Sequence, residues 1–286
     1  MIEKKIKIKL QGHEKFALRE GWLNKGIMML EKNPKVFQEK DAPDIFGMGS
    51  NMVKSLRHWL RAYGLLDEKK GGLTDIGKVI LKYDKYFEDL FTIWILHSNI
   101  AKNVDEATTW YMFFNRCNLE EFGKDEIIEC LKREIFKYTN GVPFSEQSLK
   151  NDVDVLLSMY GKEKGMTDPE DKNISPMAQL ELIRKVDGIY IKNHPDRRKI
   201  NEWDVLYELG FLMKDKKFIS IDSVSIGEKS ISSIYQIPRV TVNELLEKLN
   251  DLGYIRLDRT AGLDMIYKVM NITPEEVAES YYKLYR

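Results

Sequence analysis

The chain has 286 residues, of which 43% are hydrophobic and 11% are aromatic. Burial of this much apolar surface can offset the entropy lost on ordering, so a largely disordered chain is excluded. Lysine plus arginine total 45 and aspartate plus glutamate total 45, which excludes a surface that is basic throughout but permits a local basic face.

Missing motifs exclude several classes of enzyme. The sequence contains no P-loop, no G-x-G-x-x-G dinucleotide motif and no G-x-S-x-G nucleophile elbow. Its four histidines and two cysteines lack the spacing of a zinc site. We therefore expect no zinc, haem or nucleotide cofactor.

The cysteines and the hydropathy pattern indicate a cytoplasmic protein. Cys117 and Cys130 are too few for a disulfide framework, and their apolar helical contexts are typical of buried thiols in a reducing compartment. No apolar run reaches the roughly 18 residues of a membrane-spanning helix. Residues 1–9 alternate lysine and isoleucine, unlike a secretory signal, so we expect no membrane contact.

The first organised segment is a short helix followed by a turn and a longer helix. Residues 41–46 predict the short helix, residues 47–49 the turn, and residues 51–63 the longer helix. Ser50 is expected to be the N-cap of this longer helix, and Gly64 its C-cap. Residues 65–67 and a glycine turn at residues 71–72 predict a small β-ribbon, and this order is that of a winged helix-turn-helix.

The longer helix of this segment is predicted to have one apolar and one cationic side. The apolar side consists of Met52, Val53, Leu56, Trp59, Leu60 and Tyr63. The opposite side, here called the cationic face, consists of Asn51, Lys54, Ser55, Arg57, His58 and Arg61. It carries three formal positive charges and no acid, and cations with asparagine are typical of a helix that contacts phosphates and bases in the major groove of double-stranded DNA.

The middle of the chain is aromatic and helical. Its large side chains, which we assign to the core, are Phe91, Ile93, Trp94, Trp110, Tyr111, Phe113 and Phe114. Ser145 is expected to cap a second helix that runs through Met159, with Leu149, Val153, Leu156 and Tyr160 inward. Asp152 and Asp154 lie on or beside its outer face. This face is directed to solvent or a partner, or its acids hold a cation.

Two turn-rich stretches predict domain boundaries. Residues 161–175 are charged and contain Asp168-Pro169, which favours a linker. Residues 193–201 contain the basic triplet Arg197-Arg198-Lys199, which is interpreted either as a solvated linker or as a phosphate contact. We divide the chain into an N-terminal winged unit (1–85), a helical domain with a second helix-turn-helix-like unit (86–192) and a C-terminal winged-helix domain (193–286).

The C-terminal segment repeats the plan of the first. Residues 231–235 predict a short helix, residues 236–240 a turn, and Thr241 with Glu244 a capping box. Val242, Leu245, Leu249 and Leu252 are expected to face inward. Residues 254–258 and 263–269 predict two strands of a wing, beside which lie Arg256 and Arg259. Glu244 and Glu247 dilute the positive charge, so nucleic-acid contact and protein contact both stay open. The fold class expected is mainly α, with tandem winged helix-turn-helix units, a central helical bundle and small β-wings.

Four blocks of sequence, in one order, resemble a known family. They are Gly12-His13-Glu14-Lys15-Phe16 with Arg19 and Gly21-Trp22-Leu23; Gly47-x-Gly49-x-Asn51-Met52-Val53 with Trp59; Thr108-Thr109-Trp110-Tyr111 with Phe114; and Asp152-Val153-Asp154-Val155-Leu156. Over residues 10–190 the chain resembles the SspB-like family of the bacterial Ssp/Dnd DNA phosphorothioation and phage-defence systems. Its members have a domain of unassigned function and are encoded beside proteins resembling phosphoadenosine phosphosulfate reductase.

The resemblance implies a role in placing sulfur into the DNA backbone, with a nicking activity that depends on a divalent ion. It also implies partners, namely the reductase-like sulfur-transfer protein, an ATPase and a cysteine desulfurase. It assigns no catalytic residues to this chain.

The residues themselves suggest one arrangement for nicking. A Mg²⁺ ion held by one or two carboxylates can activate water and stabilise developing charge. We expect Glu14, Asp152 and Asp154 to be the metal ligands, although residues two apart on a helix point in different directions. His13 beside Glu14 is the expected general base. The alternatives are a solvated or structurally paired face for the two aspartates, and a loop hydrogen-bonded to the first helix for His13 and Glu14.

Two functional hypotheses follow. The first is a DNA-binding component of phosphorothioation that is also a Mg²⁺-dependent nickase. The second is a non-enzymatic winged-helix adaptor or transcriptional regulator that recruits sulfur-transfer or ATPase partners, which the zero net charge favours.

Overall fold

A computed structural model describes residues 6–161, 175–262 and 264–286. These residues form thirteen α-helices, four short 3-10 helices and three small antiparallel sheets, so the predicted mainly helical class is confirmed. The segment predicted to be a linker lies almost entirely at 162–174, outside the described residues, as do residues 1–5 of the N-terminal stretch. No helix in the described ranges is long and apolar enough to cross a bilayer.

The N-terminal unit follows an arm without helix or strand, here residues 6–16, which contains a turn at residues 12–15. Its elements are α1 (Trp22–Lys32), η1 (Val36–Gln38), α2 (Ala42–Phe46), α3 (Ser50–Ala62), β1 (Leu66–Asp67), β2 (Gly72–Leu73) and α4 (Asp75–Tyr83). The predicted short helix, turn, longer helix and ribbon are therefore all present. Ser50 is the first residue of α3 rather than its cap, while Gly64 has the positive φ of 70° expected just past a helix end.

The middle of the chain surrounds an aromatic core. Its elements are α5 (Leu90–Lys102), α6 (Thr108–Asn115), β3 (Glu121–Phe122), α7 (Lys124–Tyr138), α8 (Glu146–Tyr160), η2 (Pro176–Leu180), β4 (Ile183–Val186) and β5 (Ile189–Lys192). All seven side chains that were assigned to this core are buried. Ser145 caps α8 as predicted, because its hydroxyl accepts from the backbone N–H of Ser148.

The C-terminal unit begins near residue 197. Its elements are η3 (Arg197–Lys199), α9 (Glu202–Leu212), β6 (Phe218–Ser220), α10 (Ile221–Ser225), α11 (Ile231–Tyr235), α12 (Arg239–Asp251), β7 (Ile255–Asp258), η4 (Thr260–Gly262), β8 (Met265–Lys268) and α13 (Pro274–Tyr285). The predicted capping box is wrong, because α12 begins at Arg239 and Thr241 lies inside it. Leu252 is exposed rather than inward, since it follows the last helical residue.

The middle and C-terminal units share an order of elements. A helix, a strand, helices and a hairpin recur as α6-β3-α7-α8-β4-β5 and as α9-β6-α10-α11-α12-β7-β8. The two sheets also have matching strand orders, β3-β5-β4 and β6-β8-β7, with all pairs antiparallel. This is the order of elements that a winged helix requires, and the winged-helix assignment itself stays a prediction.

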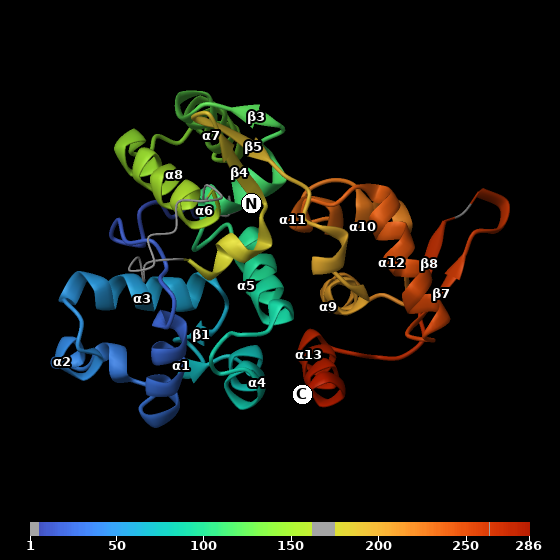
Figure 1. Ribbon diagram of the computed structural model, residues 1–286, viewed down its shortest axis with the longest axis horizontal. Coiled ribbons are helices and arrows are strands. Elements are labelled where there is room, and N and C mark those ends of the chain that lie inside the picture. Colours follow the sequence, from blue (N-terminus) through green and yellow to red (C-terminus); the bar gives the residue numbers. More distant parts are fainter. Residues whose placement is uncertain (1–5, 162–174, 263) are drawn as a thin grey trace, which may run out of the picture.

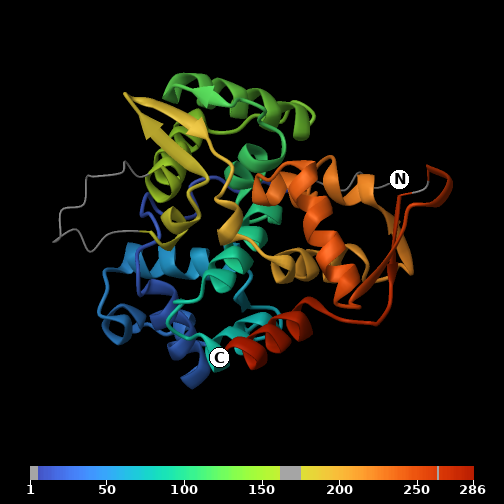
Figure 2. The same ribbon diagram turned by 45° about the vertical axis from the view of Figure 1, so that its right-hand side comes forward.

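Helix α13 joins the two ends of the chain. It packs on α9 of the C-terminal unit and on α4 of the N-terminal unit, and Figures 1 and 2 show it lying beside both. Its Tyr282 is buried, with its hydroxyl 2.6 Å from that of Thr92 on α5. The proposed boundaries at 85 and 192 fall between elements, and the three-domain division stays a prediction.

The two cysteines depart from expectation. Cys117 and Cys130 are buried, as predicted, but the structure joins them in a disulfide, so neither is a free thiol. Because Cys117 follows α6 and Cys130 lies on α7, the bond links two helices that pack together.

Candidate functional site

The apolar side of α3 is placed as its periodicity predicts. Val53, Leu56, Trp59 and Leu60 are buried against the N-terminal core, and Tyr63 follows them at the helix end. The opposite side is therefore the one that faces away from this core. Its first two members, Asn51 and Lys54, are exposed and lie together, with Lys54 Nζ 3.4 Å from Asn51 Oδ1.

Ser55 and His58 do not belong to an accessible cationic face, which corrects the prediction. Both are buried, because the N-terminal arm lies across this side of α3. Ser55 Oγ donates to the carbonyl of Phe16, and His58 lies beside the Trp59 ring. Burial, with the nearby charges of Lys9, His13 and Arg61, holds the pKa of His58 well below its ordinary value. His58 is therefore neutral at pH 7 and adds no positive charge.

Arg57 and Arg61 are screened by acids from other elements. Arg57 Nε donates to Glu68, at the end of the β1 strand, and Arg61 Nη1 lies 3.5 Å from the same carboxylate. Arg61 Nε lies 3.3 Å from Glu106, in the α5–α6 connection. The hydrogen bond from Arg57 lowers the pKa of Glu68, so this acid is ionised at pH 7. The positive potential of the cationic face is consequently smaller than α3 alone suggests.

His13 and Asp152 meet in a buried network between the arm, α6 and α8. Asp152 Oδ1 accepts from the backbone N–H of Gln11 at 2.7 Å and from His13 Nε2 at 2.8 Å, while Oδ2 accepts from Thr109 Oγ1 at 2.6 Å. His13 Nδ1 accepts from the backbone N–H of Lys15 at 3.1 Å, which assigns the ring proton to Nε2.

This network is a structural clamp and not an open catalytic site. His13 and Asp152 are each 1% exposed, and the His13 ring stacks on Trp59 with centroids 5.6 Å apart. A general base must reach the proton that it removes, and the His13 side chain is almost wholly buried. This conformation therefore does not favour the expected catalytic role of His13 with Glu14. The alternative of a loop hydrogen-bonded to the first helix does not describe it either, because His13 bonds to Asp152 of α8 and to Lys15 within the arm.

The three expected metal ligands do not assemble. Both oxygens of Asp152 already accept hydrogen bonds from the protein, whereas Asp154 points outward and pairs with Lys124 at 2.5 Å. Glu14 lies in the arm with a left-handed φ of 50° and is partly exposed. Across the described ranges, no group of three histidine, cysteine, aspartate or glutamate side chains is placed to hold an ion. These residues thus do not fit a Mg²⁺ ion, and we assign no metal ligand.

In the C-terminal unit the two arginines that were predicted to contact DNA have different partners. Arg259 pairs with Glu247 of α12 at 2.7 Å. Arg256 is exposed and lies over the ring of Tyr267, with its guanidinium 4.2 Å from the ring centroid. The basic triplet at 197–199 is neutralised, because its three side chains pair with Glu244, Asp196 and Glu181 respectively.

Sequence reasoning missed the β4–β5 hairpin and the two screening acids. Strands β4 and β5 flank Asp187-Gly188, which have φ values of 50° and 83°. An Asp-Gly pair between short apolar runs is a strong hairpin signal, so this hairpin was detectable from the sequence. Glu68 and Glu106 carry no such signal, because their approach to α3 depends on the tertiary fold.

Comparison with known proteins places the fold. The family described as protein of unknown function (DUF4007) matches residues 10–282, so the similarity includes the C-terminal unit. Two solved structures, one of SspB and one of magnesium ion-bound SspB, each align with a TM-score of 0.83 and 23% sequence identity, covering 96% of this chain and 88% of theirs. No curated protein matches the sequence.

Proposed function

We propose that this chain, which belongs to the family described as protein of unknown function (DUF4007), is a DNA-binding component of a bacterial DNA phosphorothioation system. The observation that carries the proposal is the fold shared with SspB over nearly the whole chain. The sequence blocks that resemble the SspB-like family support it independently, because they were identified without the structure. On this proposal its partners are the sulfur-transfer protein, the ATPase and the cysteine desulfurase of the same system.

The order of elements also favours DNA contact. Two units have the sequence of helices and strands found in winged helices, and the N-terminal unit has a short helix, a longer helix and a ribbon. On α3 we retain Asn51, Lys54, Arg57 and Arg61 as DNA contacts and exclude Ser55 and His58, because these two are buried. In the C-terminal unit we retain Arg256 and Arg259.

A pair of opposite substitutions tests the role of α3. Arg57→Gln removes a cation and should weaken binding to duplex DNA, lowering the salt slope by about one. Glu68→Gln should strengthen binding and steepen the salt dependence, because it releases both arginines from the same carboxylate. Fluorescence anisotropy of a labelled duplex, measured over a range of salt concentrations, gives both quantities.

Glu31→Gln is the matched control, since it makes the same charge change at an exposed position of α1. It should change affinity less than Glu68→Gln. The Arg57–Glu68 pair is half-buried and open to solvent, and pairs of this kind contribute only about 1 kcal/mol to stability, so each variant should fold. Identical affinities for the wild type, Arg57→Gln and Glu68→Gln would remove α3 from the DNA interface.

Mg²⁺-dependent nicking is the second part of the proposal. One of the aligned SspB structures holds a magnesium ion. We assign no residue of this chain to the ion, because Glu14, Asp152 and Asp154 do not form a site. Incubation of supercoiled plasmid with Mg²⁺ or with EDTA tests the activity directly. We expect the plasmid to become open circular with Mg²⁺ and to stay supercoiled with EDTA. If it stays supercoiled under both conditions, the nicking proposal is rejected.

The adaptor hypothesis is favoured by the screening of the cationic face. Glu68 and Glu106 pair with both of its arginines, and these acids would repel phosphates. A protein surface of mixed charge can contact such pairs more readily. If the adaptor hypothesis holds, duplex DNA will not bind even at low salt, while the purified sulfur-transfer or ATPase partner will. This outcome would replace the DNA-binding proposal.

A further inference from the structure

The C-terminal sheet has one covered and one open face. Its strands β6, β8 and β7 place Phe218 opposite Tyr267, and Tyr267 opposite Arg256. The neighbouring residues Ile219, Ile266 and Ile255 are buried on the face that packs against α10 and α12. Because side chains alternate along a strand, the first three form a line across the other face, here called the aromatic–arginine row.

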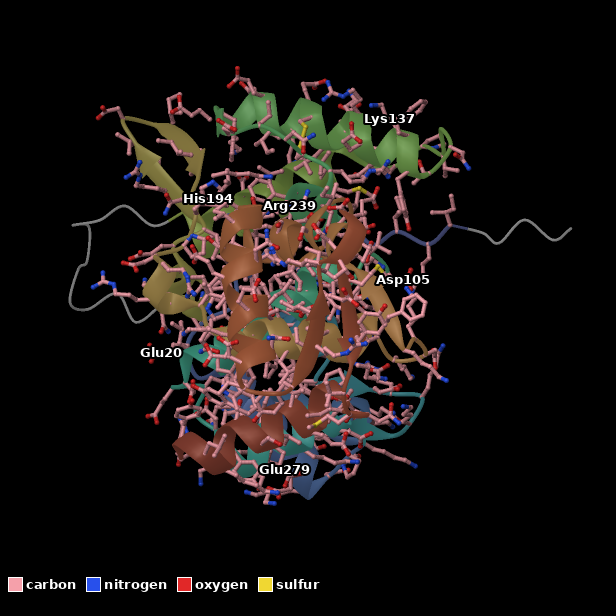
Figure 3. All side chains as sticks on the ribbon, turned by 90° about the vertical axis from the view of Figure 1, so that its right-hand side faces the viewer. Glu20, Asp105, Lys137, His194, Arg239 and Glu279 are labelled. Carbon is pink, nitrogen blue, oxygen red and sulfur yellow. A yellow bond between two sulfur atoms is a disulfide. The ribbon has the colours of Figure 1, made fainter. Side chains whose placement is uncertain are left out.

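The row is preformed and accessible. Phe218 is 53% exposed, and the Arg256 side chain is 61% exposed. The rings of Phe218 and Tyr267 have centroids 5.7 Å apart, and the Arg256 guanidinium lies 4.2 Å from the Tyr267 centroid. Two aromatic rings and a guanidinium plane therefore stand in contact on the surface. The hairpin of β7 and β8 lies at the outer edge of the molecule in Figure 1, and Figure 3 views the molecule from this side.

A cluster of lysines lies at one end of the row. The segment before β6, residues 214–217, contributes Lys214, Lys216 and Lys217, which are exposed. Within the part of the chain that the structure describes, none of the three has a carboxylate at ion-pair distance. Lys268 joins them at the end of β8, because its Nζ lies 3.3 Å from the carbonyl of Lys214, and alternation along the strand directs it to the side opposite Tyr267. These four residues are here called the lysine cluster.

The cations of the row differ from those of α3 in how they are paired. Acids near the row are Asp215, within the lysine segment, and Asp258, whose carboxylate lies 3.9 Å from Arg256. Around α3 the number of charges is similar, but Arg57, Arg61, Lys7 and Lys9 are each within ion-pair distance of Glu68 or Glu106. In the described residues the lysines at 214, 216 and 217 have no such partner, so their side chains are available to phosphates.

We propose that the aromatic–arginine row and the lysine cluster bind an unpaired DNA strand. Bases stack on exposed rings and on arginine planes, while lysines at the edge hold the phosphates, which is the usual combination in single-strand binding. In duplex DNA the base faces are already stacked on one another, so exposed rings cannot stack on them. The inference rests on the proposed function, because it names the form of DNA that one part of the chain takes.

Binding to a labelled oligothymidylate of about 15 nucleotides, followed by anisotropy, tests the row. Replacing both rings, Phe218→Leu with Tyr267→Leu, should weaken binding about tenfold or more, because each base–aromatic stack is lost. Tyr267→Phe should keep the affinity of the wild type, since it keeps the ring. Both positions are at the surface, and thermal unfolding checks that the variants are folded.

The control for ring loss is Phe136→Leu, an exposed aromatic residue on α7 far from the sheet in sequence. It should leave the affinity unchanged. The lysine cluster is tested by Lys216→Gln with Lys217→Gln, which should lower the salt slope by about 0.7 for each phosphate contact removed. The pair Lys35→Gln with Lys40→Gln makes the same charge change on the N-terminal unit and should affect binding to the oligothymidylate less.

The outcomes separate this inference from the proposed function. The row is not a single-strand site if the ring variants bind the oligothymidylate as tightly as the wild type does. The same follows if the wild type binds duplex DNA but not the oligothymidylate. In both cases the DNA-binding proposal still holds. If the wild type binds neither form of DNA, both proposals are rejected. If the ring variants keep their DNA affinity but lose binding to a purified partner protein, the row is a protein contact and the inference is overturned.

Discussion

Asp152 ties together three segments that are distant in sequence. Its buried carboxylate accepts from Gln11 and His13 of the arm and from Thr109 of α6. Asp152→Asn removes the charge and puts an amide N–H₂ where an acceptor is needed. We expect a loss of about 2–4 kcal/mol in the free energy of unfolding, measured by urea denaturation.

Asp154→Asn is the matched control, two residues along the same helix and exposed. Its loss should be below about 1 kcal/mol, because Asp154 is half exposed and pairs with the surface residue Lys124. If the two variants lose equally little unfolding free energy, the Asp152 network does not hold these segments together. A functional role for the Asp152 carboxylate would then be open again.

His97 gives the molecule an acid-sensitive core. Burial lowers its pKa from 6.5 to about 4, although its Nε2 lies 2.7 Å from the carbonyl of Ile234. The folded state therefore binds the proton less readily than the unfolded state. This contribution to stability is fully present above pH 6.5 and is lost as the pH falls towards 4, by about 3 kcal/mol in all.

Urea unfolding at a series of pH values checks this sign. Between pH 6.5 and 4 the wild type should lose more stability than His97→Gln, which cannot take up a proton. Carboxylates affect both proteins alike, so the difference between the two curves isolates His97. A difference that stays constant over this range would show that His97 titrates normally.

At the scale of elements, the arm and α3 meet so closely that only glycine fits at one position. A Cβ built on Gly12 would lie 2.5 Å from His58 Nδ1, and this ring is itself buried. Gly12→Ser should therefore displace the arm from α3 and cost about 1–3 kcal/mol in unfolding free energy.

Gly49→Ser inserts the same side chain where nothing lies within 4 Å, at the N-cap of α3. This variant should be at least as stable as the wild type, because serine is a favourable N-cap. Thermal or urea unfolding measures both. A Gly12→Ser protein as stable as Gly49→Ser would mean that the arm does not pack against His58.

At the scale of the whole molecule, α13 packs on both the N- and C-terminal units, so we expect the two units to unfold together. Tyr282 packs on Tyr83 of α4 and on Phe91 of α5, with ring centroids 5.6 and 5.9 Å apart. Tyr282→Ala should cost about 3–5 kcal/mol and separate the unfolding of the two units. Calorimetry should give one transition for the wild type and two for the variant.

Tyr285→Ala, near the exposed end of the same helix, is the control and should keep a single transition. Two transitions already present in the wild type would show that α13 does not couple the units. That result would instead favour the division of the chain into independent domains.

The sequence by itself determined the elements and their apolar sides. The helices α3 and α8, the short helix α11 and the aromatic core could all be predicted, because helical periodicity and capping residues are local properties of the chain. The start of α12 could not, because Thr241 has the sequence of an N-cap although the helix begins after Pro238. The hairpin of β4 and β5 could have been predicted from its Asp-Gly turn.

Only the tertiary structure decided which polar side chains are accessible. Periodicity states which side of a helix is apolar, but it cannot state whether another segment covers the polar side. The arm buries Ser55 and His58, Glu68 and Glu106 pair with the arginines of α3, and the register of three strands brings Phe218, Tyr267 and Arg256 into one row. Each of these contacts joins residues far apart in the chain, so it depends on the packing of the whole molecule and not on any local pattern.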